Sequence, residues 1–120
     1  MNIDGFKREA VKQDKRNVFE SCSADTSFVP TELQDFFKNA NPIDVEITMD
    51  GNAVRFYPLS DLLQLQKDYG LVGGRFVFAT CNSDPIYIFE NKVYTCCHGN
   101  SKSSDEKMAS SFVDFLALID

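Results

Sequence analysis

The sequence predicts a single α+β domain with a mainly antiparallel or mixed sheet and flanking helices, in the order α-α-β-β-α-β-β-β-α. Three observations predict this class. The chain has 120 residues, of which 43% are hydrophobic, so residues 1–120 match one ordinary domain with a real core. Clusters of turn-forming residues separate successive apolar runs, which is typical of antiparallel hairpins. The predicted elements do not alternate strand with helix throughout, which excludes a Rossmann pattern.

Two helices are predicted in the first third of the chain. Residues 3–19 are weakly amphipathic, and small and polar residues then end the pattern. Residues 29–41 predict a clearer helix, because Pro30 suits a first helical turn. Its apolar stripe has the spacing i, i+3, i+4 and i+7, and comprises Leu33, Phe36, Phe37 and Ala40. Asn41-Pro42 ends this helix, since a residue before proline disfavours the α region.

A hairpin is predicted next. Residues 43–49 alternate between apolar and polar side chains, which indicates a strand with one buried and one solvated face. The residues expected to face the core are Ile43, Val45, Ile47 and Met49. Asp50-Gly51 predicts the turn, because glycine accepts a positive φ, and residues 52–58 return as the partner strand.

Residues 59–97 predict a helix followed by three strands. Ser60 offers an N-cap oxygen to a helix over residues 61–69, which Gly70 ends. The residues of this segment expected to pack inward are Leu59, Leu62, Leu63 and Tyr69. The following strands are expected at residues 75–80, 86–89 and 93–97, with turns at 82–85 and 90–92.

The last predicted element is a helix over residues 105–119, preceded by a polar loop that begins at His98. Asp105 and Glu106 would lie near the positive end of its dipole. Its apolar residues recur at helical spacing and comprise Met108, Ala109, Phe112, Phe115, Leu116 and Ile119.

The charge of the chain limits its partners. The formal net charge is −6, with net +1 in residues 4–20 and net −7 in the remainder. A general nucleic-acid binder needs positive charge to displace counterions from phosphates, so no nucleic-acid partner is expected. The acidic body is compatible with a basic protein partner, and equally with plain solubility.

The expected location follows from the lack of a recognisable signal peptide or membrane span in the sequence. Its first residues are too polar for a signal peptide, and no apolar run approaches the roughly 18 residues of a membrane span. We therefore expect no membrane partner and a cytoplasmic protein. In that compartment the four cysteines are expected to be free thiols.

The segment YTCCHGN holds two adjacent cysteines and the only histidine. Zinc sites usually show paired ligands such as C-x₂-C, and adjacent strand residues point to opposite faces, so Cys96 and Cys97 do not readily share an ion. A Cys–His nucleophile needs a thiol within reach of His98 and a third, orienting group. The favoured interpretation is structural thiols, one inward and one outward, with no catalytic residue, no cofactor and no metal. A small enzyme or metal protein using Cys97 and His98 stays a remote alternative.

Acidic residues are the remaining candidates for a functional surface. The candidate residues for contact with a partner are Asp44, Glu46, Asp50, Asp84 and Glu90. Asp44 and Glu46 share the solvated face of the predicted strand, and the others fall at turns. Their spacing does not match an EF-hand, and solvation is the commoner role of such charges.

Several segments together resemble the SUKH superfamily, which is related to the yeast regulators of cell-wall assembly. The similar segments are VPTELQDFFKNAN, VRFYPLSDLLQLQKDYG, FVFATCNSDPIYIFENKVYTCCHG and MASSFVDFLALI, within residues 28–119. The matching residues are Pro30, Leu33, Phe37, Phe56, Leu59, Phe78, Ala79, Asp84, Val93, Tyr94, Ala109, Ser111, Phe112, Phe115 and Leu116. The sequence departs from the family pattern at Asn41-Pro42, where an Asn-Gly turn is usual, and at Asn82-Ser83, where a glycine-rich turn is common.

The resemblance implies an α+β domain without common catalytic residues. Many bacterial members are immunity proteins that bind and neutralise a cognate toxin, often a nuclease. It therefore implies a non-enzymatic protein-binding domain whose partner is a toxin, and the acidic body suits a basic toxin. We expect a monomer or weak dimer. An intracellular regulatory or scaffold domain, as in the eukaryotic relatives, is the alternative.

Overall fold

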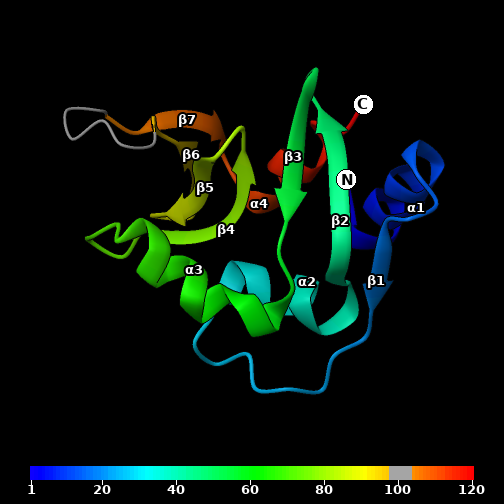
Figure 1. Ribbon diagram of the computed structural model, residues 1–120, viewed down its shortest axis with the longest axis horizontal. Coiled ribbons are helices and arrows are strands. Elements are labelled where there is room, and N and C mark those ends of the chain that lie inside the picture. The colour runs from blue at the N-terminus through cyan, green and yellow to red at the C-terminus, as the bar shows by residue number, and fades with distance from the viewer. Residues whose placement is uncertain (98–103) are drawn as a thin grey trace.

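A single antiparallel sheet organises the chain. The computed structural model describes residues 1–97 and 104–120, and in these residues seven strands lie in sequence order, each paired with the next (Figure 1). The strands are β1 (Val18–Glu20), β2 (Asn41–Met49), β3 (Asn52–Phe56), β4 (Phe76–Cys81), β5 (Asp84–Phe89), β6 (Lys92–Thr95) and β7 (Glu106–Ala109). This confirms the predicted α+β class with an antiparallel sheet. β1 and β7 are additions to the predicted order.

Four α-helices accompany the sheet in the described residues. They are α1 (Ile3–Gln13), α2 (Thr31–Asn39), α3 (Leu62–Tyr69), which a 3₁₀ turn (Leu59–Asp61) precedes, and α4 (Phe112–Leu116). Helix α3 lies beside the first half of β4, where β3 has already ended. There the Gln66 side chain donates to the Val77 carbonyl at 2.7 Å and accepts from the Val77 N–H at 2.8 Å. One side chain thus forms the two backbone hydrogen bonds that a neighbouring strand would otherwise form. None of the described helices is both long and apolar enough to cross a membrane.

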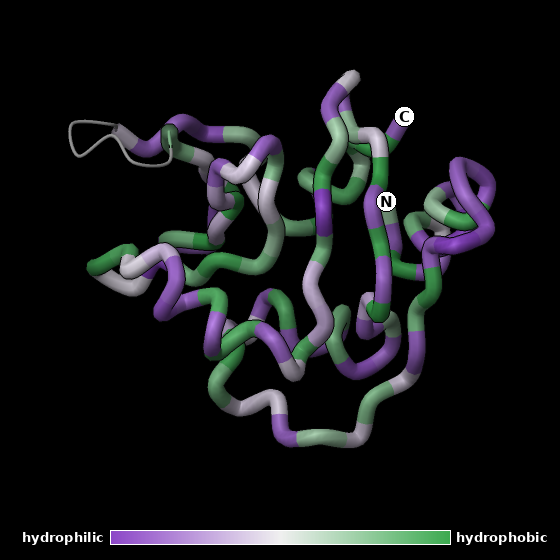
Figure 2. Tube along the Cα trace, viewed as in Figure 1, coloured by the Kyte–Doolittle hydropathy of each residue, from purple (hydrophilic) through white to green (hydrophobic). Residues whose placement is uncertain are grey.

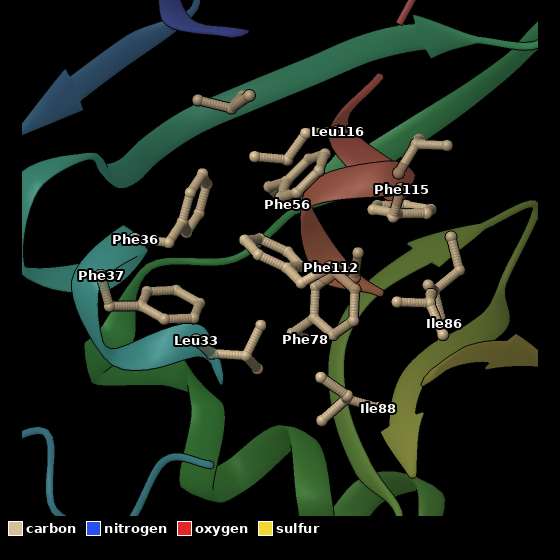
Figure 3. Close-up of a cluster of buried hydrophobic side chains, with 14 of the residues drawn as sticks. Leu33, Phe36, Phe37, Phe56, Phe78, Ile86, Ile88, Phe112, Phe115 and Leu116 are labelled. Carbon is tan, nitrogen blue, oxygen red and sulfur yellow. The ribbon is translucent and has the colours of Figure 1, made fainter. Parts of the chain in front are cut away.

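Phenylalanine supplies most of the large-volume packing. Seven of the eleven are buried, namely Phe6, Phe36, Phe37, Phe56, Phe78, Phe112 and Phe115. Phe36 on α2 contacts Phe6 on α1 and Phe112 on α4, with ring centroids 6.0 and 5.1 Å apart. Figure 3 shows the rings of Phe36 and Phe112 beside those of Phe56 on β3 and Phe78 on β4. Three helices and the sheet therefore share one aromatic core.

Three two-residue turns set the register of the meander. Both central residues of each turn have positive φ, as a type I′ turn requires. The turns are Asp50-Gly51, Asn82-Ser83 and Glu90-Asn91. All three lie where the sequence predicts a turn.

The C-terminal segment differs from the prediction of one helix over residues 105–119. Glu106–Ala109 instead pair with β6 as a strand, and the helix begins only at Phe112. Ser111 has an extended backbone, and its hydroxyl accepts from the Asp114 N–H at 3.0 Å, which fixes the helix start there. Ala109 and Phe112 are nevertheless buried as predicted, because both elements turn them toward the same core.

The N-terminal helix is also shorter than predicted. It ends at Gln13, and Val18 belongs to β1 instead.

In β2 the predicted alternation fails at Ile43, which is 41% exposed. Ile43 is the extra residue of a bulge, because Val18 pairs with Asp44 whereas the next residue pairs with Pro42. Beyond Ile43 the alternation holds, and Figure 2 shows its alternating hydropathy along β2.

The entry into α3 corrects two further predictions. Ser60 does not cap the helix, because the chain first makes the 3₁₀ turn and the helix starts at Leu62. This shift of phase also leaves Leu63 58% exposed and buries Leu65 in its place. The predicted end is confirmed, since Gly70 has φ +59° in the left-handed region.

Candidate functional site

A groove with a volume of about 700 Å³ lies between α1, α2 and α4. Its floor is formed by Phe36, Phe112 and Leu116, which belong to the shared core (Figure 3). Val113 stands on its wall and is 52% exposed. The groove therefore continues the hydrophobic core to the surface.

Carboxylates line the rim of this groove. Asp4 comes from α1, and Glu32 and Asp35 come from α2. Glu32 and Asp35 lie three residues apart, and both precede Phe36, so the helical repeat places all three on the face that α2 turns toward the groove. No lysine or arginine lines it. The result is an apolar surface with an acidic border.

The predicted acidic candidates do not form one surface. Asp44 and Glu46 project from the solvent-exposed face of β2. Asp50, in the turn after β2, and Asp84, at the start of β5, lie at one end of the sheet, because β3 and β4 run antiparallel. Glu90 lies in the turn after β5, at the opposite end.

The two acids on β2 are close to positive charge. Asp44 forms an ion pair with Arg55 on β3, with 3.2 Å between the oxygen and nitrogen atoms. Glu46 lies directly opposite Arg55 in the β2–β3 register. Both acids help to raise the pKa of Arg16, after the larger effect of its hydrogen bonds to Asp14. This part of the surface is therefore mixed in sign, whereas the charged side chains that line the groove are all carboxylates.

A second polar cluster joins three segments that are distant in the sequence. The Asp105 carboxylate, just before β7, accepts from Arg75 at 3.0 and 2.7 Å and from the buried Tyr87 hydroxyl. The Arg75 guanidinium also lies 4.1 Å from the centroid of the Phe89 ring. Each charged or polar group thus has a partner, which is the arrangement of a structural clasp.

The pKa values in this cluster follow from its contacts. Hydrogen bonds from Arg75 lower the pKa of Asp105, against the smaller opposing effect of burial. Burial raises the pKa of Tyr87 strongly, and its hydrogen bond to Asp105 adds to the shift. The tyrosine therefore stays protonated as a donor at neutral pH.

The sequence contains one signal for this cluster. Tyr87 lies between two isoleucines in an apolar strand, and a buried tyrosine hydroxyl usually needs a partner. The sequence does not identify this partner, because the spacing of residues 105–119 predicts a helix that begins at Asp105. The groove likewise forms where three helices converge, and no local sequence pattern predicts how these helices pack together.

The cysteines of the described residues do not gather into a reactive site. Cys22, Cys81 and Cys96 are half-buried, and Cys97 is exposed. Burial raises the pKa of the Cys81 and Cys96 thiols, which disfavours the nucleophilic thiolate. In residues 1–97 and 104–120, no three His, Cys, Asp or Glu side chains are placed to hold a metal ion. His98, which the remote alternative of a small enzyme or metal protein would use with Cys97, lies outside the described residues.

Comparisons with known proteins add no family to these observations. No family model, no curated protein and no solved structure matches the chain. The similarity to the SUKH superfamily therefore stays a prediction from sequence motifs, beside an α+β fold that the structure shows.

Proposed function

We propose that this chain is a non-enzymatic, cytoplasmic protein-binding domain, and specifically an immunity protein that neutralises a basic toxin. The observation that carries the proposal is the apolar groove with its acidic rim. An open apolar surface bordered by one sign of charge suits a protein partner of the opposite sign. The sequence motifs shared with the SUKH superfamily and the net charge of −6 support the same conclusion.

The polar clusters outside the groove support binding over catalysis. A catalytic acid or base needs a proton that it can exchange near neutral pH. The shifts at Tyr87, Asp105 and Cys96 move each pKa further from neutrality. These groups are suited to hold the fold together, with the surface left to recognition.

Co-expression tests the proposed function. A cytotoxic domain encoded next to this chain should stop growth when expressed alone, and co-expression of this chain should restore growth. The purified pair should form a stable complex. Killing that continues despite co-expression would contradict the immunity role. Recovery of a housekeeping protein as the stable partner, with no toxin encoded nearby, would instead support the regulatory or scaffold alternative.

A further inference from the structure

We propose that the groove between α1, α2 and α4 binds a basic amphipathic helix of the partner protein. This inference rests on the proposed function and names the part of the partner that is recognised. Its shape, its charge and the type of element around it each contribute to the assignment.

The apolar floor can receive large side chains. The apolar side chains that reach its surface are Met1, Ile3 and Val113, and they lie over the buried Phe36, Phe112 and Leu116. The volume of about 700 Å³ lies in the range of roughly 300–1,000 Å³ that small-molecule pockets occupy. The groove can therefore hold several anchoring side chains of a helix, at spacing i, i+3 or i+4.

The rim selects positive charge. Asp4 and Glu32 lie in the first turns of α1 and α2, where an acid also stabilises the helix dipole. Asp35 lies in the middle of α2, where the dipole gives it no such role. Lys7 and Arg8 follow one turn after Asp4 but do not line the groove. The field at the rim therefore favours lysine and arginine beside the apolar anchors.

A helix fits this site better than a strand. The lining residues belong to the three helices and to Met1 and Asn2, which precede α1. An added strand would need a sheet edge with free backbone groups, and no strand contributes to the lining. A helix satisfies its own backbone and needs only side-chain contacts.

The first experiment uses a defined probe. A peptide of about 14 residues, roughly four helical turns, carries leucines on one face and lysines on the other. Titration into ¹⁵N-labelled protein should shift the amide signals of α2 and α4 around Glu32 and Val113. A peptide of the same composition in scrambled order, and one with glutamate in place of lysine, should bind much more weakly. Equal binding of these peptides, or shifts confined to other surfaces, would overturn the assignment.

Matched variants separate charge from apolar contact. Glu32→Gln with Asp35→Asn should weaken the peptide about 2- to 30-fold, the range for two exposed ion pairs. The control, Asp61→Asn directly before α3 with Asp68→Asn on α3, removes the same charge away from the groove. Val113→Gln should weaken binding about tenfold through lost apolar burial, whereas Leu63→Gln, at a similarly exposed helix position, should not. Equal effects in variant and control would contradict the proposal.

The same variants distinguish this inference from the proposed function. If wild type rescues cells from the toxin but the groove variants fail to, both proposals are supported. If the groove variants rescue fully, the groove assignment is wrong while the immunity role stands. If wild type does not rescue, the immunity role fails, and peptide binding alone decides the groove. Self-association of wild type that Val113→Gln abolishes would show that a second copy, not a basic helix, occupies the groove.

Discussion

Asp105 connects three segments through one side chain. Its carboxylate accepts two hydrogen bonds from Arg75 and one from the buried Tyr87 hydroxyl. In Asp105→Asn the charge is lost and the donors of Arg75 and Tyr87 lose an acceptor. We expect the free energy of unfolding at pH 7 to fall by about 1–3 kcal/mol, measured by urea denaturation. Asp61→Asn, at an exposed position without a capping hydrogen bond, should change it little.

The effect of Asp105 should depend on pH. Its pKa is lower in the folded protein, so the unfolded chain takes up the proton first as pH falls. The stabilisation is complete well above the ordinary aspartate pKa of about 3.9 and is lost as pH falls through the lower, folded value. The difference between wild type and Asp105→Asn should therefore shrink between pH 7 and pH 3. A difference that stays constant would show that charge is not its cause.

The start of α4 is determined by a single hydroxyl. Ser111 accepts from the Asp114 N–H, whereas Ser60, which the sequence predicts as an N-cap, makes no capping bond. We expect Ser111→Ala to lower the free energy of unfolding by about 0.5–2 kcal/mol and Ser60→Ala to leave it nearly unchanged. Thermal or urea denaturation measures both. A larger loss in Ser60→Ala would mean that the helix before Gly70 starts at residue 61 after all.

At the scale of the elements, local features can be predicted from the sequence and long-range pairing cannot. Turn chemistry is local, so Asp50-Gly51 and Asn82-Ser83 could be located from residue type alone. The pairing of β7 with β6 is not local, and the spacing of Met108 and Ala109 fits a helix equally well. Residues 106–109 form a strand because they pair with the edge of the sheet at β6.

At the scale of the whole molecule, composition indicated the kind of surface but not its location. The acidic balance is visible in the sequence, and the structure spreads the five candidate acids over one strand face and both ends of the sheet. The carboxylates that border an apolar surface are Asp4, Glu32 and Asp35. They meet because α1 and α2 pack against one aromatic core, which depends on contacts far apart in the sequence.

This distribution of charge predicts how association with a basic toxin responds to salt. Long-range attraction accelerates encounter, and exposed charges are screened beyond a Debye length of about 10 Å at 0.1 M salt. The association rate should therefore fall as salt rises from 0.05 to about 0.5 M, while dissociation changes less, because it depends on apolar contacts in the groove. Stopped-flow or surface-plasmon measurements of both rates test this. Glu32→Gln with Asp35→Asn should flatten the salt dependence of association more than Asp61→Asn with Asp68→Asn. An association rate that is independent of salt would remove the electrostatic part of the proposal and leave recognition to the apolar floor alone.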